Sequence, residues 1–223
     1  MGKKTIRMSM DIGMALLLPV LMAYSLIGEV FHEVIGSLML FLFIGHGLLN
    51  RRWYQSVFRG KYLLRRIFQT IVNGLLLIIM ALQPLSGILM SKHLYTFIQI
   101  SGVTASARAV HLFLAYWGLV LMNVHAGTHM MPLLAKMKKR KFPKTVILIL
   151  AAVSLYGCMA FFKRQIPDYM FGRSSFVFFD YSEPRLFFFM DYLSVMILFA
   201  LAGFLIVTVL EHFTKYPKSL ERE

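Results

Sequence analysis

Charged residues are scarce in this sequence, and acidic ones are scarcest. Only 15% of the 223 residues are Asp, Glu, Lys or Arg, whereas 58% are apolar. Soluble domains typically contain about 25% charged and about 45–50% apolar residues, so the composition excludes an ordinary soluble domain. Several apolar runs reach the roughly 20 residues that a helix needs to cross a bilayer. The sequence therefore predicts an integral membrane protein.

Cysteine is nearly absent, because Cys158 is the only one. A single thiol forms no internal disulfide and no cysteine metal cluster, and Cys158 lies in an apolar run where packing explains it. The G-x-G-x-x-G fingerprint is also missing, so oxidation of a nicotinamide dinucleotide would need another subunit. The segment 8–28 lacks the small-residue cleavage site of a signal peptide, and we expect it to be the first membrane span.

Hydropathy predicts an all-α, polytopic bundle of six transmembrane helices. The expected helices cover 8–28, 30–50, 69–91, 106–131, 145–163 and 190–211. Pro84 is expected to kink the third helix, and Pro132 is expected to end the fourth. We expect one domain over 1–223, in which 8–131 forms a four-helix core and 145–211 adds two helices.

Basic residues are abundant, and they lie mainly on one side of the predicted bundle. The net charge is +14, and 18 of the 24 Lys and Arg residues lie in 1–7, 51–68, 132–144 and 212–223. The other six are Lys92, Arg108, Lys163, Arg164, Arg173 and Arg185. The positive-inside rule places the basic side, and with it both termini, in the cytoplasm. Since the membrane explains the charge, we expect no nucleic-acid partner.

The opposite side carries an aromatic segment, RQIPDYMFGRSSFVFFDYSEPRLFFF, over 164–189. One interpretation is an interfacial helix that lies on the lipid headgroups. The alternative is a docking surface for a partner or a lipid quinone.

Two histidines lie fourteen residues apart in the second predicted helix. A helix advances about 100° and about 1.5 Å per residue, so His32 and His46 project from nearly one face, roughly 21 Å apart along the axis. The fourth predicted helix repeats this interval with His111 and His125. The two helices run in the same direction, so we expect His32 to face His111 near the outer surface and His46 to face His125 nearer the inner one.

Four ionisable groups at matched depths in a membrane indicate function. Iron held between two imidazoles explains both pairs, because each haem takes one axial histidine from each helix. We therefore expect two haem b groups, with His32, His46, His111 and His125 as iron ligands. They would be held without covalent attachment, since no C-x-x-C-H motif is present.

Other residues in these helices are candidates for contacts with the haem. Glycine permits close approach of another surface, so Gly36 and Gly118 are candidate cofactor-binding positions, although ordinary helix packing explains them equally well. Arg108 is a candidate partner for outer haem propionates, and Arg51 and Arg52 are weaker candidates for inner ones. Each arginine has an alternative role as a topology or headgroup charge.

Three histidines fall outside the two pairs. His129 lies one turn after His125 and aligns well with His111, but it breaks the matched depth with the second helix. We therefore prefer His125 as the ligand and expect His129 to form hydrogen bonds near the inner haem. His93 and His212 have no matched partner.

Two segments carry a resemblance to a known family, HEVIGSLMLFLFIGHGLLNRRWY and RAVHLFLAYWGLVLMNVHAGTHM. They resemble the flavinylation-associated transmembrane cytochrome b family over the first four helices and more loosely over the last two. SGILMSKHLY, after the third helix, is part of this likeness. The histidine interval is also similar to that of the cytochrome b subunit of quinol-oxidising bc complexes. The long quinol-site loops of those complexes are missing, so their proton-coupled cycle is not implied.

The resemblance implies a prokaryotic, multi-pass protein of the cytoplasmic membrane. In that family the four matched histidines bind two haems. Electrons cross the membrane between the quinone pool and extracytoplasmic flavin-bearing proteins. The chain would be an electron-transfer subunit of a membrane oxidoreductase rather than a stand-alone enzyme, with a quinone as a further ligand. The alternatives are a histidine-lined metal or proton transporter, which usually needs intramembrane carboxylates, and a non-redox membrane anchor. Asp11, Glu29, Glu33, Asp191 and Glu211 are all expected near helix ends.

Overall fold

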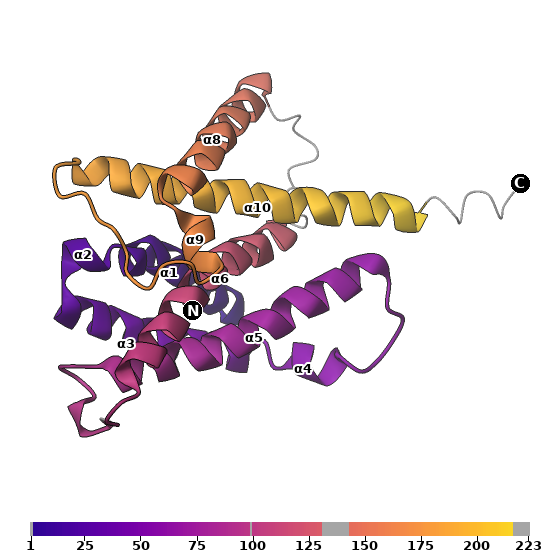
Figure 1. Ribbon diagram of the computed structural model, residues 1–223. Helices are drawn as coiled ribbons and strands as arrows, with labels where there is room; N and C mark the ends of the chain where they lie inside the picture. The colour runs from indigo at the N-terminus through magenta and orange to yellow at the C-terminus, as the bar shows by residue number, and fades with distance from the viewer. Residues whose placement is uncertain (1, 99, 131–142, 216–223) are drawn as a thin grey trace, which may run out of the picture. The chain divides into compact units, whose positions relative to one another are not determined.

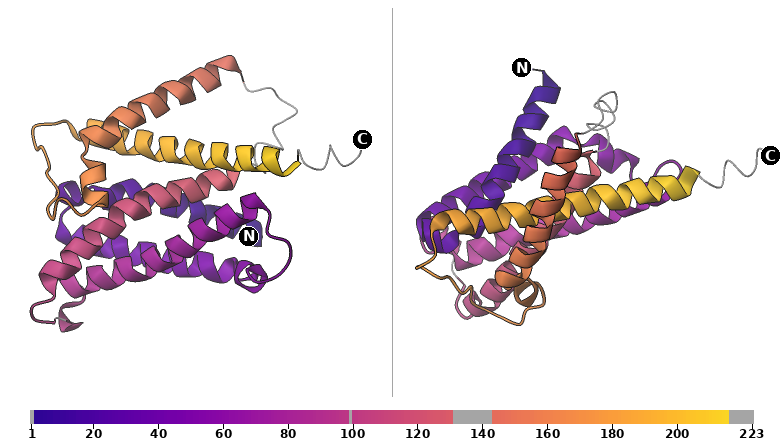
Figure 2. Two further views of the ribbon diagram at one scale, coloured as in Figure 1. Left: turned by 45° about the vertical axis from the view of Figure 1, so that its right-hand side comes forward. Right: turned by 90° about the horizontal axis from the view of Figure 1, so that it is seen from above.

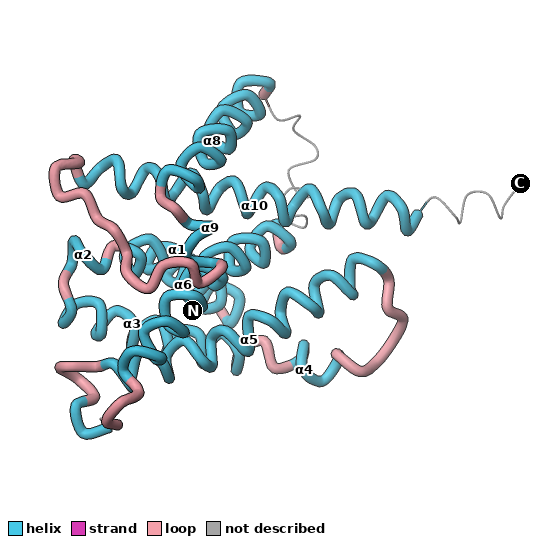
Figure 3. The backbone as a smooth tube through the Cα atoms, viewed as in Figure 1, coloured by secondary structure: helices cyan, strands magenta, loops and turns pink. Residues whose placement is uncertain are grey.

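The protein is helical, and six of its helices have the length and composition of membrane spans. The computed structural model describes residues 2–98, 100–130 and 143–215, and these ranges contain no strand (Figure 3). The six long helices are α1 (Lys3–Met22), α3 (Glu29–Leu49), α5 (Leu64–Met90), α6 (Thr104–Thr128), α8 (Lys144–Lys163) and α10 (Arg185–Lys215) (Figure 1). The predicted all-α membrane bundle is confirmed.

Short helical segments lie between the long ones. They are α2 (Tyr24–Ile27), α4 (Arg52–Ser56), the 3₁₀ turn η1 (Thr96–Ile98) and α9 (Ile166–Met170). The expected first helix, 8–28, is interrupted at Ala23, whose N–H bonds the carbonyl of Val20 in a tighter turn. Gly28 then adopts a φ of +81°, a conformation that costs glycine little, and the chain enters α3.

Two helices are longer than hydropathy predicts. α5 begins at Leu64 rather than at 69, and α10 covers Arg185–Lys215 rather than 190–211. Charged residues depress hydropathy without ending a helix, and Arg65 on α5 binds Glu211 on α10 in these end turns. α5 continues past Pro84 to Met90. Pro132 lies outside the described residues.

The chain divides into two compact units, which we describe separately. Unit 1 comprises Met1–Arg59, Ile78–Trp117 and Pro167–Phe189. Unit 2 comprises Gly60–Leu77, Gly118–Ile166 and Met190–Glu223. The unit boundaries fall inside α5, α6 and α10, so each of these helices contributes to both units. The single domain over 1–223, with its parts 8–131 and 145–211, stays a prediction.

In unit 1, α1 packs against α3. Glycines lie at this contact: a Cβ on Gly13 would lie 3.6 Å from Leu42, and one on Gly36 would lie 3.9 Å from Leu21. At the end of α3, the Arg7 guanidinium donates a hydrogen bond to the carbonyl of Leu49. α1 is therefore held beside the histidine-bearing helix along much of its length.

In unit 2, three glycines let helix backbones touch. A Cβ on any of them would collide with the backbone of a neighbouring helix. The pairs are Gly127 with Ala200, Gly203 with Val124 and Gly157 with Ser194. Both views in Figure 2 show α8 crossing α10, in agreement with the Gly157 contact. Close packing of small residues is a common means of helix association in membranes.

Candidate functional site

The structure brings His32 and His111 together in unit 1. Their ring centroids lie 6.1 Å apart, and the ring planes are inclined by 69°. Imidazole nitrogens bind metal ions at about 2 Å, so two rings sharing one metal have centroids about 6 Å apart. The observed separation fits an iron between the two imidazoles, and it equally fits direct edge-to-face packing of the two rings.

His111 is oriented by the turn of α5 around Pro84. Its Nδ1 lies 3.2 Å from the carbonyl oxygen of Gln83 and 3.1 Å from Oγ of Ser86. A carbonyl can only accept, so Nδ1 donates and Nε2 keeps its lone pair. The Gln83 side-chain amide, 3.2 Å away, meets that lone pair, while its Oε1 is buried without a hydrogen-bond partner in the part of the chain that the structure describes. A metal bound through Nε2 of His111 would take the place of the Gln83 amide.

Gly87 gives His111 room against α5. A Cβ at position 87 would lie 3.3 Å from Cε1 of His111, which is closer than ordinary van der Waals contact. The glycine on α5 and the imidazole on α6 thus fit together closely.

His32 lies beside α1 and α2. Its Nδ1 is buried and makes no hydrogen bond of normal geometry among the described residues, although the Leu21 backbone lies near enough to interact with the ring. The ring of Tyr24 packs edge-on against the imidazole, with centroids 5.2 Å apart.

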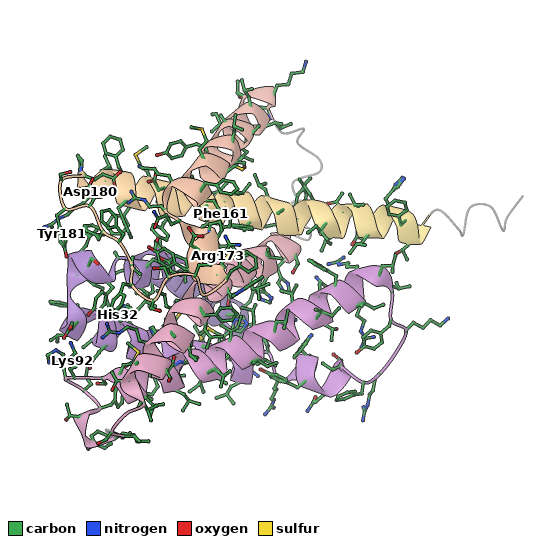
Figure 4. The ribbon with its side chains drawn as sticks, viewed as in Figure 1. His32, Lys92, Phe161, Arg173, Asp180 and Tyr181 are labelled. Atoms are coloured by element: carbon green, nitrogen blue, oxygen red, sulfur yellow. The ribbon has the colours of Figure 1, made fainter. Side chains whose placement is uncertain are left out.

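Acidic residues and a loop lie at the N-terminal end of α3. The Glu33 carboxylate accepts hydrogen bonds from Oγ of Ser91 and from the backbone N–H groups of Lys92 and Leu94, at 2.7–2.9 Å. Lys92 also donates to Glu29 at 2.7 Å. Figure 4 labels His32 on α3 and Lys92 in the loop after α5. These bonds hold the SKHLY segment to the helix that carries His32.

Tyr24 and His93 belong to the same cluster at the N-terminal end of α3. The Tyr24 hydroxyl donates to Glu29 at 3.0 Å, and Nε2 of His93 lies 3.4 Å from the other Glu29 oxygen. Desolvation and the hydrogen bond to Glu29 raise the pKa of the Tyr24 hydroxyl. His93 therefore has an acidic partner that accounts for its place in the loop.

His46 is held by α1. Its Nδ1 lies 2.7 Å from Oδ1 of Asp11, and the Asn50 side-chain amide lies 3.3 Å from Nε2. The carboxylate fixes Nδ1 as the protonated nitrogen when the imidazole is neutral. Asp11 was expected near a helix end. Because α1 begins at Lys3, Asp11 instead lies inside the helix, and that expectation is wrong.

His125 is held by α5 within unit 2. Its Nδ1 lies 2.7 Å from Oδ1 of Asn73, which can only accept a hydrogen bond. The ring of His129 lies against it, with centroids 4.7 Å apart. His125 therefore has a defined orientation and His129 as a direct neighbour.

His46 belongs to unit 1 and His125 to unit 2, so each is described within its own unit. Their pairing stays a prediction from the sequence. So does the assignment of all four histidines as iron ligands.

Three of the four candidate ligands share one arrangement. In His46, His111 and His125, Nδ1 faces an oxygen acceptor. Metal-binding histidines usually donate their second ring N–H to a carboxylate or carbonyl, which fixes the tautomer and orients the ring. The arrangement leaves Nε2 of each as the lone-pair nitrogen. The Gln83 amide contacts this nitrogen in His111 and the Asn50 amide contacts it in His46, so a metal would replace these two contacts.

The acceptors Asp11, Asn73 and Gln83 were not singled out from the sequence. Side-chain polarity in a predominantly apolar span is the signal that marks Asp11 and Asn73, whereas the acceptor at Gln83 is a backbone carbonyl and carries no such signal. Which of them meets a histidine depends on helix rotation, which hydropathy does not predict.

Two of the other candidate cofactor residues, Arg108 and Gly36, contact other side chains of unit 1. The Arg108 guanidinium lies over the ring of Phe176, 5.4 Å from its centroid. Gly36 faces Leu21 of α1, and Gly118 is buried in α6. Arg51 and Arg52 are exposed. Their roles toward a haem stay predictions.

The aromatic segment at 164–189 is largely non-helical. Only α9 precedes the loop at 171–184, so the interfacial helix expected here is wrong for that stretch. Gly172, with a φ of +64°, and Pro184 bound a turn-rich sequence that favours a loop. Large apolar side chains are nevertheless exposed along it, namely Phe171, Phe176, Val177, Phe178 and Tyr181. Irregular backbone is not tolerated in lipid hydrocarbon, which places this loop at or beyond the membrane surface.

A buried ionic cluster in unit 2 was also missed. The Asp191 carboxylate is fully buried and accepts hydrogen bonds from Tyr156, Lys163 and Arg164. The last two bonds measure 2.9 and 2.8 Å. These contacts tie the end of α8 to α10.

No group of three or more His, Cys, Asp or Glu side chains is placed to hold a metal ion among the described residues. An iron held by two imidazoles needs only two protein ligands, so the paired histidines remain the candidate metal site. Comparison of the chain with protein-family models, with curated proteins and with solved structures finds no match.

Proposed function

We propose that this protein is a membrane cytochrome of the b type that carries electrons across the membrane. His32 and His111 bind one haem, and His46 and His125 bind a second. The observation that carries the proposal is the approach of His32 to His111, at 6.1 Å between ring centroids. The equal spacing of the histidines in α3 and α6 extends the proposal to the second pair.

The chain's own residues orient the ligands. The Gln83 carbonyl holds Nδ1–H of His111, Asn73 holds that of His125 and Asp11 holds that of His46. When bound, haem supplies reversible one-electron chemistry, whose potential depends on axial ligands, hydrogen bonds and burial.

The partners follow from the family resemblance. Quinone in the membrane would exchange electrons with one haem, and an extracytoplasmic flavin-bearing protein would exchange them with the other. The chain then acts as the electron-transfer subunit of an oxidoreductase in a prokaryotic cytoplasmic membrane. The exposed aromatic side chains of the loop at 171–184 supply a surface at which a partner or a quinone would meet the protein.

Electron transfer across a sealed membrane tests this proposal. Purified protein is placed in liposomes that contain ferricyanide, and a membrane-impermeant reductant is added outside. We expect the trapped ferricyanide to be reduced much faster than in empty liposomes. The double variant His32→Ala, His46→Ala, which lacks one ligand of each pair, should abolish the gain. Protein that holds both haems but transfers no faster than empty liposomes would refute the conduit function.

A further inference from the structure

The hydrogen bond between Asp11 and His46 is unlike the contacts of the other candidate ligands. Its acceptor is a carboxylate, at 2.7 Å from Nδ1. The acceptors at His111 are a backbone carbonyl and a hydroxyl, and the acceptor at His125 is an amide. Among these described contacts, only His46 faces an acidic group.

The bond joins two helices whose mutual packing is defined. Asp11 is on α1 and His46 on α3, both in unit 1, and these helices contact each other along their length. The His46 side chain is 25% exposed and that of Asp11 is 53% exposed. An acidic side chain within a membrane helix is costly, which favours a functional role for one that is retained beside an imidazole.

A carboxylate acceptor changes the electronic character of an imidazole. It draws the Nδ1 proton toward itself and makes Nε2 a stronger electron donor. A more strongly donating axial ligand stabilises the oxidised iron relative to the reduced iron, and so lowers the reduction potential. A neutral acceptor such as a carbonyl has a weaker effect.

We propose that Asp11 is a positioning residue that sets the tautomer of His46 and lowers the reduction potential of the haem that His46 binds. The proposal rests on the proposed cytochrome function. Through this bond the protein biases electrons away from the His46 haem and toward the haem of His32 and His111. The hydrogen bond thus contributes a direction to electron flow, from the basic side of the membrane to the opposite side.

A neighbouring cation supplies a control for simple charge effects. Arg7 lies one helical turn before Asp11, and its guanidinium donates to the carbonyl of Leu49. Arg7→Gln changes the local charge without removing the bond to His46. The Arg7→Gln variant should slightly lower the reduction potential of the haem that His46 binds. It should leave the EPR g values of that haem unchanged.

The experiment is a potentiometric titration of the purified full-length protein, with low-temperature EPR of the oxidised haems. His46→Ala first identifies which haem signal depends on His46. Asp11→Asn should raise the midpoint potential of that haem and change its EPR g values, while the other haem keeps both. Asp11→Glu, which restores a carboxylate, should move the potential back toward the wild-type value.

A second acidic residue serves as the matched control. Asp168→Asn makes the same chemical change at a residue that pairs with Arg173 rather than with a histidine. It should leave both haems unaltered.

Each remaining outcome decides the proposal. Loss of only the His46-dependent haem in Asp11→Asn, with recovery in Asp11→Glu, supports the positioning role. Loss of both haems would show a general structural role instead and overturn it. An unchanged reduction potential in Asp11→Asn would also overturn the proposal. So would a changed potential with unchanged g values, because that combination indicates a through-space charge effect rather than a change in the ligand. A wild-type protein without haem would refute the proposed function itself.

Discussion

The imidazole of His32 on α3 lies 6.1 Å from that of His111 on α6, measured between ring centroids. The two residues are distant in the sequence, and each belongs to a helix that is otherwise largely apolar there. The matched histidine spacing of the two helices predicts that these two residues lie close together, and the structure shows this for His32 and His111. It makes the outer pair the best-supported candidate site in the protein.

Removing either member of this pair should remove one haem. His32→Ala and His111→Ala are each expected to lower the haem content from two per chain to one, because one imidazole cannot supply both axial ligands. The measurement is a pyridine haemochrome assay on purified protein. His93→Ala, which changes a histidine that pairs with Glu29, should keep both haems. Full haem content in either pair variant would contradict the assignment.

Filling the space beside His111 should have a similar effect. Gly87→Val places a branched side chain where a Cβ alone would lie 3.3 Å from the imidazole, so His111 must move. We expect reduced content of the outer haem and an altered spectrum for what remains. Gly74→Val is the control on the same helix, since a Cβ there meets nothing within 4 Å. Equal behaviour of the two variants would show that the spectrum does not depend on the position of His111.

The buried Asp191 should matter for stability rather than for haem binding. Asp191→Asn leaves Arg164, whose side chain is only 13% exposed, without its carboxylate. Breaking a buried pair in this way typically costs about 3–5 kcal/mol. Lys163→Ala removes a half-exposed partner and should cost about 0–1 kcal/mol. Thermal unfolding in detergent measures both, and a smaller loss for Asp191→Asn than for Lys163→Ala would contradict the prediction.

Accessibility of engineered cysteines tests the predicted topology. In a Cys158→Ala background, Ser56→Cys lies in α4 and Ser175→Cys lies in the aromatic loop, and both positions are exposed. The distribution of basic residues predicts that α4 faces the cytoplasm. An impermeant maleimide added to intact cells should therefore label Ser175→Cys but not Ser56→Cys until the membrane is opened. The reverse pattern would invert the topology.

The spans could be predicted from the sequence because a long apolar run has few alternatives to a membrane helix. Their ends were less predictable. Ala23 interrupts the first span without a marked change in hydropathy, and Arg65 lies in a helical turn that its charge would exclude from a span. The non-helical loop at 171–184 was misjudged, because its aromatic residues are equally suited to a helix and to an exposed loop.

The candidate site could likewise be predicted only in part. The histidine spacing alone predicted that His32 and His111 face each other. The partners Asp11, Asn73 and Gln83 depend on how α1 and α5 rotate toward the histidine helices. Rotation is set by packing contacts, such as Gly13 against Leu42, that a single sequence does not display.

The central claim is that the chain binds two haems through four histidines. The most direct measurement is the reduced-minus-oxidised visible spectrum of the purified protein from haem-sufficient cells, combined with the ratio of haem to protein. The account predicts a b-type spectrum and two haems per chain, released by acidified acetone because they are not covalently attached. A colourless protein would contradict the claim.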